Sequence, residues 1–146
     1  MYKNIVLKDI CEIWSGVKLG RLKKTNIISF SDITYKVLTF KAIDENGNID
    51  NNEIEEISDI NNDVSKYIIK HGDIVVGFSI PVKVFYARYL DSNIIATSHF
   101  AVIRLCDNMI IPEYLYNYLE NYFRYSKKYI SNTGIFAITI DIIKNI

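Results

Sequence analysis

Apolar and polar residues alternate through the middle of the chain, a pattern typical of β-strands with two different faces. The alternation is clearest from Val82 to Tyr89, where lysine and arginine interleave with aromatic and branched residues. A strand is also predicted at 74–78, and its run of isoleucine and valine is interrupted from Gly77 by the sequence Gly77-Phe78-Ser79-Ile80-Pro81. This break predicts either a loop that presents polar groups to a partner or a simple bulge or hairpin turn. The other predicted strands span residues 35–43, 65–69, 93–97 and 100–105.

Helical spacing replaces the alternation toward both ends of the chain. The segment LKDICEIW, residues 7–14, predicts a short amphipathic helix that Ser15-Gly16 ends. Pro112 opens the longest predicted helix, because proline is favourable at the first helical position, and Thr139 caps a last one. The buried stripe expected on the long helix consists of Leu115, Leu119, Tyr122 and Tyr129.

The order of these elements indicates the fold class. Many short strands come first and one long helix comes late, with no helix between the middle strands. We therefore expect an α+β fold with a curved, mostly antiparallel sheet, a short N-terminal helix and a long helix in the C-terminal third. The length of 146 residues and the hydrophobic content of 49% fit a single domain spanning residues 1–146.

Charge is segregated along the chain, although the formal net charge is zero. Residues 44–63 hold eight of the 17 acidic residues and no lysine or arginine. Residues 17–41 hold six basic residues against one acidic residue, Asp32. This segregation predicts one basic face. Two solvated loops of opposite charge are the alternative explanation.

Several classes of protein are disfavoured by the sequence. No apolar stretch approaches the roughly 18 residues of a membrane span, and charged residues interrupt the N-terminus where a signal peptide is apolar. We therefore expect a cytoplasmic protein with no membrane partner. Cys11 and Cys106 are far apart in sequence, and free buried thiols are expected. No cysteine or histidine cluster has metal-ligand spacing, so no metal and no cofactor are expected.

Histidine offers one route to hydrolytic chemistry. The sequence has two histidines, and a small metal-dependent nuclease would use His71, Asp73 and His99 together. Histidines in turns are more often exposed or hydrogen-bonded than catalytic. No nucleophile-elbow, zinc-protease, P-loop or dinucleotide-binding motif occurs. We therefore expect no catalytic residue and keep the nuclease as an alternative.

Nucleic-acid binding is supported by a combination of features. The predicted loop that contains Gly16 and Gly20 is basic, and glycine lets backbone amides approach phosphates closely. Polar groups at other predicted loop tips suit hydrogen bonds to base edges. The residues predicted to hold phosphates are Lys18, Arg21, Lys23, Lys24 and Lys83. The residues predicted to lie nearer the bases are Ser79, Ser98, His99 and Thr133.

Tyrosines on the long predicted helix offer a different kind of surface. They are Tyr114, Tyr116, Tyr118, Tyr122, Tyr125 and Tyr129. The simpler explanation is a wide helix face that packs on the sheet while its phenols reach water. The alternative is a protein-docking surface, since tyrosine is enriched at interfaces.

Four segments, taken in order, resemble a known family. They are LKDICEIWSG at the start, YIIKHGDIVVGFS in the middle, ATSHFAVIRL followed by IIPEYLYNYL, and SNTGIFAITIDIIKNI at the end. Their order is similar to that of a target recognition domain in the specificity subunit of type I restriction–modification systems. The similarity covers nearly the whole chain.

This resemblance implies a non-catalytic module that binds double-stranded DNA in a sequence-specific manner. It would read one half of a bipartite target for the methyltransferase and restriction subunits of the same system, and the loop at 77–81 would face the duplex. The chain departs from the family pattern because it has one recognition domain and ends where a spacer helix would begin. A homodimer is therefore possible, and a fragment that competes for methyltransferase subunits through the tyrosine-rich helix is the alternative function.

Overall fold

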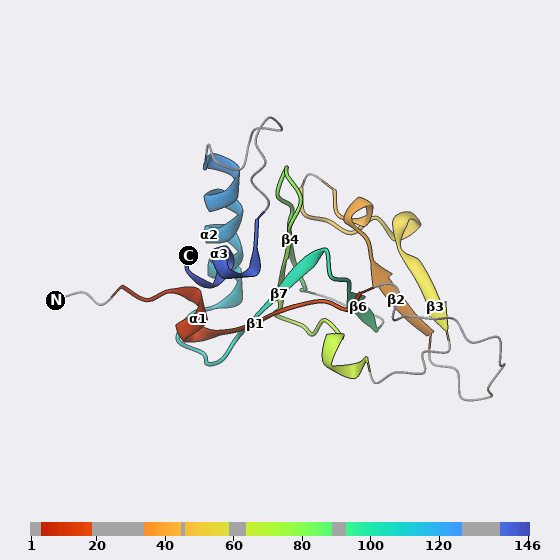
Figure 1. The fold of residues 1–146 in the computed structure, drawn as a ribbon, viewed down its shortest axis with the longest axis horizontal. Helices are drawn as coiled ribbons and strands as arrows, with labels where there is room; N and C mark the ends of the chain where they lie inside the picture. The colour runs from red at the N-terminus through yellow and green to blue at the C-terminus, as the bar shows by residue number, and fades with distance from the viewer. Residues whose placement is uncertain (1–3, 19–33, 45, 59–63, 89–92, 127–137) are drawn as a thin grey trace.

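The computed structural model describes residues 4–18, 34–44, 46–58, 64–88, 93–126 and 138–146. These residues form two sheets of short strands, with the main helices gathered beside the first sheet (Figure 1). The expected α+β class with mostly antiparallel short strands is confirmed. The strands divide between two sheets, whereas the sequence pattern alone predicted one curved sheet.

The first sheet is antiparallel throughout. Its order is β1 (Cys11–Ser15), β7 (Phe100–Leu105), β4 (Ile74–Gly77) and β5 (Val84–Tyr86). Every residue of β4 and β5 is buried, because helices cover one face of this sheet and a second apolar cluster covers the other. Burial on both faces explains why the run at β4 is continuously apolar rather than alternating.

The second sheet is mixed. β2 (Thr34–Leu38) lies between β3 (Glu55–Ser58), which is antiparallel to it, and β6 (Ile94–Ala96), which is parallel. The chain passes from the second sheet to the first through the turn at residues 97–99, between β6 and β7. That turn is therefore a junction between the sheets.

The helix predicted over residues 7–14 is wrong beyond its first turn. α1 spans only Leu7–Ile10, and the residues that follow form β1, where Cys11 pairs with Leu105 and Ser15 with Ala101. The apolar residues of this segment fit both a helical and a strand period. Pairing along β7 favours the strand, because it satisfies backbone N–H and C=O groups that a helix of this length would leave without hydrogen bonds at its ends.

Two other predicted strands are shorter than the pattern indicated, and a third, at residues 65–69, is not formed. β2 ends at Leu38 and is followed by a 3₁₀ turn, η2 (Phe40–Ala42). The carbonyls of Phe40 and Ile43, in and next to this turn, accept hydrogen bonds from the ammonium of Lys83. Residues 65–69 form the 3₁₀ turn η4 (Ser65–Tyr67) and one isolated bridge instead of a strand. In the predicted strand at 82–89, of which residues 82–88 are described, only Val84–Tyr86 joins the sheet. A further 3₁₀ turn, η3 (Asn51–Glu53), precedes β3.

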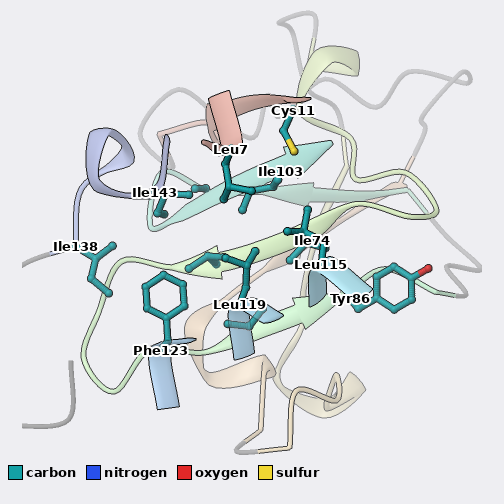
Figure 2. Close-up of a cluster of buried hydrophobic side chains, with 13 residues drawn as sticks. Leu7, Cys11, Ile74, Tyr86, Ile103, Leu115, Leu119, Phe123, Ile138 and Ile143 are labelled. Carbon is teal, nitrogen blue, oxygen red and sulfur yellow. The ribbon is translucent and has the colours of Figure 1, made fainter. Parts of the chain in front are cut away.

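α2 (Pro112–Tyr125) and α3 (Ile140–Lys144) begin as the sequence predicted. Pro112 starts α2, and the Thr139 hydroxyl accepts a hydrogen bond from the Ile142 amide at 3.3 Å. Leu115, Leu119 and Phe123 of α2 point toward the first sheet and share a core with Leu7, Ile103 and Ile143 (Figure 2).

Tyr122 does not belong to this buried stripe. It is 36% exposed, whereas Phe123 is 3% exposed. The spacing of four residues from Leu115 through Leu119 continues to position 123, so Tyr122 lies outside and stacks on Tyr118 with ring centroids 6.3 Å apart. Tyr129, also predicted in the stripe, lies outside the described residues.

The two ends of the described chain meet beside α1. The Leu7 amide donates to the Ile146 carbonyl at 3.0 Å, and the Lys8 ammonium donates to the Asn145 side chain at 3.0 Å. Figure 1 shows α1 and α3 together on the side of the molecule away from the second sheet. This contact closes the helical layer over the first sheet.

Both cysteines are free, as predicted, but only Cys11 is buried. Burial raises the pKa of the Cys11 thiol to about 12, whereas Cys106 is exposed. Within the described ranges no helix is long and apolar enough to cross a membrane. The same ranges contain no group of three or more acidic, histidine or cysteine side chains arranged to hold a metal ion.

Candidate nucleic-acid interface

Four of the predicted DNA-contacting residues are carried by chain segments that meet at the turn between the two sheets. The Ser98 amide donates to the Val17 carbonyl at 2.9 Å, and the Phe78 amide donates to the His99 carbonyl at 3.0 Å. Lys18 and Ser79 each follow directly after one of these bonded residues. We call Lys18, Ser79, Ser98 and His99 the corner surface. Ser98 is half-buried, and the other three residues are exposed.

Gly16 allows β1 to reach this corner. Its amide donates to the Phe100 carbonyl at 3.1 Å, and the next amide, that of Val17, donates to the Ala96 carbonyl at 3.0 Å. A Cβ atom at position 16 would lie 2.2 Å from the Thr97 carbonyl oxygen. Only glycine therefore allows the chain after β1 to lie against the turn between the two sheets.

The interruption at residues 77–81 is the loop of the hairpin between β4 and β5. The Gly77 amide donates to the Lys83 carbonyl at 2.9 Å, which closes the loop around Ser79. The Ile80–Pro81 peptide bond is cis. A Cβ atom on Gly77 would lie 3.0 Å from the Phe40 ring, so glycine also lets this ring pack against the base of the loop. The two interpretations of this break, a hairpin turn and a loop that presents polar groups, therefore describe the same loop.

Lys83 occupies a different environment from the corner surface. Its ammonium donates to the Ile43 carbonyl at 2.6 Å and to the Phe40 carbonyl at 3.2 Å, and it lies 4.4 Å from the centre of the Phe40 ring. Two of its three hydrogen-bond donors are therefore used within the protein. The structure gives Lys83 the role of a bridge from the base of the loop to η2. Its predicted contact with phosphate stays a prediction.

The acidic turn after η2 is ordered by its own carboxylate. Asp44 Oδ1 accepts from the amides of Asn48 at 2.9 Å and Asn46 at 2.8 Å, and Gly47 adopts a positive φ of +77°, which glycine takes without steric cost. The Asn48 amide is the main cause that lowers the pKa of Asp44, and the positive charge of Lys83 lowers it further. This acidic turn is thus held next to Lys83.

The remaining predicted contact residues are Arg21, Lys23, Lys24 and Thr133, and they lie outside the described residues. Their predicted contacts with DNA stay predictions.

The three residues of the alternative nuclease site are not brought together. Asp73 is 1% exposed, and both of its carboxylate oxygens bind Arg104, at 2.8 and 2.6 Å. His71 Nδ1 contacts the Arg88 carbonyl. His99 lies beside Phe78, at the opposite end of β4 from Asp73, which places the two about 15 Å apart at the rise of a strand.

A hollow near β1 contains residues that the sequence pattern did not single out. It has a volume of about 490 Å³ and is lined by Glu12, Trp14, Ser15, Lys66, Tyr67 and Arg104. Glu12 and Trp14 were assigned to a helix, so their position on a strand face beside Arg104 was missed. The alternation in CEIWS is the signal that indicates this face.

Comparison with known proteins identifies the family. The family model described as "Type I restriction modification DNA specificity domain" matches residues 2–146. No curated protein matches the sequence. Among solved structures, the crystal structure of the HsdS subunit from Thermoanaerobacter tengcongensis is similar with a TM-score of 0.50 at 14% sequence identity, over 97% of this chain and 31% of that chain.

The structural likeness shows a shared fold, and this chain spans about a third of the length of that subunit. The family match covers nearly the whole sequence and agrees with the resemblance read from the four segments. The chain therefore belongs to the family of type I restriction modification DNA specificity domains, a non-catalytic specificity component.

Proposed function

We propose that this domain reads one half of a bipartite target in double-stranded DNA. The observation that supports the proposal is the corner surface, where residues from three separate segments are held together by backbone hydrogen bonds at the junction of the two sheets. Backbone bonds of this kind fix the spacing of the side chains before DNA arrives. Such preorganisation lowers the entropy cost of binding.

Within this proposal the residues of the corner surface have different roles. Lys18 supplies a positive charge for a phosphate, a contact that positions the domain without reading sequence. Ser79, Ser98 and His99 carry groups that both donate and accept hydrogen bonds, which suits base edges in the major groove. Arg21, Lys23, Lys24 and Thr133 are proposed as further contacts.

The experiment that tests the proposal is selection of bound duplexes from a random pool, followed by titration of a selected duplex at several salt concentrations. Replacing Lys18 by alanine lowers the salt slope by about one unit, because one phosphate contact is lost. Lys8→Ala is the matched control, because Lys8 lies at the other end of β1, next to Asn145. If no sequence is enriched and the two variants behave alike, the proposal fails.

The larger assembly is part of the same proposal. We propose that residues 1–146 act as a single recognition domain, and that a methyltransferase and a restriction subunit join it. Binding by one domain alone is expected to be weak, because linking two half-sites raises the affinity. A homodimer would supply such a link. A DNA-reading role also fits the cytoplasmic location expected from the sequence.

A second candidate function is supported by the outer face of α2. Tyr114, Tyr118, Tyr122 and Tyr125 are all exposed, between 36% and 73%. Exposed tyrosines are common at protein interfaces, so this row supports docking to, or competition for, a methyltransferase subunit. Capture of that subunit in the absence of DNA, and its loss in a Tyr114→Ser, Tyr118→Ser variant, separates docking from DNA reading.

A further inference from the structure

The hollow beside β1 is distinct from the corner surface. It lies between the strand face that carries Glu12, Trp14 and Arg104 and the 3₁₀ turn η4, which contributes Lys66 and Tyr67. None of the four corner residues lines it. Its chemistry therefore needs an explanation of its own.

Arg104 is a fixed cation in the wall of this hollow. Its guanidinium binds the two carboxylate oxygens of Asp73 and lies 4.7 Å from the centre of the Trp14 ring. These contacts use one edge and one face of the guanidinium, and Nη2 also donates to the Ile68 carbonyl at 3.5 Å. The side chain remains 27% exposed. A fixed planar cation loses little conformational entropy when its remaining N–H groups bind a ligand.

A second cation and an acceptor complete the lining. The Lys66 ammonium lies 5.0 Å from the centre of the Tyr67 ring. Glu12 is exposed and stands directly opposite Arg104 in the register of β1 and β7. The hollow thus combines two aromatic rings, two cations and one exposed carboxylate.

This combination is poorly matched to a simple anion, because Glu12 would repel it. It matches a ligand that has a phosphate, a planar ring and an amino group. Phosphate binds Arg and Lys, unpaired bases stack on aromatic side chains, and carboxylates accept from exocyclic amines.

We propose that the hollow binds an unpaired nucleotide. Arg104 and Lys66 hold its phosphate, Tyr67 and Trp14 contact its base, and Glu12 accepts a hydrogen bond from the base's amino group. A base within a duplex keeps its faces stacked and does not fit this site. The proposal therefore goes beyond duplex reading and does not depend on it.

The single tryptophan of the protein, Trp14, reports on the hollow directly. Its fluorescence is followed while the protein is titrated with deoxycytidine monophosphate, with an oligodeoxycytidine of eight nucleotides and with thymidine monophosphate. Thymidine monophosphate lacks an exocyclic amine. Inorganic phosphate and a hexaglutamate peptide are run in parallel. A saturable change with both cytidine ligands, at least fivefold tighter than with thymidine monophosphate or phosphate, is expected. Comparing the affinity for the oligonucleotide with that for the monophosphate shows whether the hollow prefers a nucleotide within a strand or a free nucleotide.

Variants test the individual contacts. Tyr67→Ala is expected to weaken oligodeoxycytidine binding between about 5-fold and 150-fold through lost stacking. Lys66→Ala weakens it and lowers the salt slope, whereas Lys70→Ala, an exposed lysine on the same segment that does not line the hollow, leaves binding unchanged. Near-UV circular dichroism checks the fold of the Tyr67 variant, and the exposed Lys66 leaves the core untouched.

The proposal is overturned by any of three results: no saturable change with either cytidine ligand, an equal response to phosphate alone, or tighter binding of hexaglutamate. Duplex binding is measured on the same samples by anisotropy of a labelled selected duplex. The absence of nucleotide binding at the hollow and the absence of duplex binding are therefore measured separately.

Discussion

Arg104 and Asp73 form a two-point ion pair that joins β7 to the start of β4, with Nε–Oδ1 at 2.8 Å and Nη2–Oδ2 at 2.6 Å. Asp73 Oδ2 also accepts from the Lys70 amide at 2.8 Å, so this nearly buried carboxylate holds the turn before β4 as well. Both strands are central in the first sheet.

Replacing Asp73 by asparagine is expected to lower the free energy of unfolding by about 3 kcal/mol, because it leaves the guanidinium of Arg104 without its counter-charge. Urea unfolding followed by circular dichroism measures the change. Glu12→Gln is the control, since Glu12 is exposed and no hydrogen bond joins it to Arg104 among the contacts described; its effect is expected within about 0.5 kcal/mol. Equal losses in both variants would contradict a special role for the pair.

Lys83 is expected to act as an internal bridge more than as a phosphate contact. Lys83→Met removes the hydrogen bonds to the carbonyls of Ile43 and Phe40 and should lower the free energy of unfolding by about 2 kcal/mol. The salt slope of DNA binding should stay unchanged. A slope that falls by about one unit, as expected for Lys18→Ala, would instead support the sequence-based prediction that Lys83 holds a phosphate.

Gly16 is expected to tolerate no side chain. Gly16→Ala places a methyl group against the backbone oxygens of Thr97 and Ala96, and neither atom can move without shifting the turn between the sheets. A loss of about 3 kcal/mol or more is expected, together with weaker DNA binding, because Val17 would no longer support Ser98. Thermal unfolding of Ser15→Ala, at an exposed neighbouring position, provides the comparison and should stay close to wild type.

The two thiols are expected to differ in reactivity. At pH 8, iodoacetamide should modify the exposed Cys106 and leave Cys11 unmodified, because burial holds the pKa of Cys11 near 12. Mass spectrometry should show one adduct on the native protein and two in denaturant. Two adducts on the native protein would show that Cys11 is accessible.

The raised pKa of Cys11 also predicts a dependence of stability on pH. The folded state favours the protonated thiol, so its contribution is complete below the usual pKa of 9.0 and is lost as pH rises toward 12. The difference in the free energy of unfolding between wild type and Cys11→Ala should therefore shrink over this interval. A constant difference would mean that the thiol does not titrate with folding.

Local patterns predicted those elements whose residues carry their own signal. The apolar runs at β4 and β7, Pro112 at the start of α2 and the Thr139 cap are each determined by a few neighbouring residues. Residues 11–14 were wrongly assigned to a helix because their apolar spacing fits two periods, and only the pairing with β7 decides between them. The parallel pairing of β2 with β6 joins residues far apart in sequence and leaves no local signal.

The candidate site likewise combines features that local sequence predicted and features that depend on tertiary contacts. Exposed residues at predicted loop tips, such as Ser79 and His99, were correctly identified as loop residues, because turn residues and strand ends mark such positions. The bond from Phe78 to His99 that brings them together is tertiary and could not be read from spacing. Likewise, nothing near Lys83 in sequence indicates that the carbonyls of Ile43 and Phe40 bind its ammonium.

The bond between the Leu7 amide and the Ile146 carbonyl has a consequence for any longer chain that contains this domain. The chain that enters the domain at Leu7 and the chain that leaves it at Ile146 lie side by side, on the helical side and away from the turn between β6 and β7 (Figure 1). A unit joined in this way can be replaced by another of the same fold without remodelling its host.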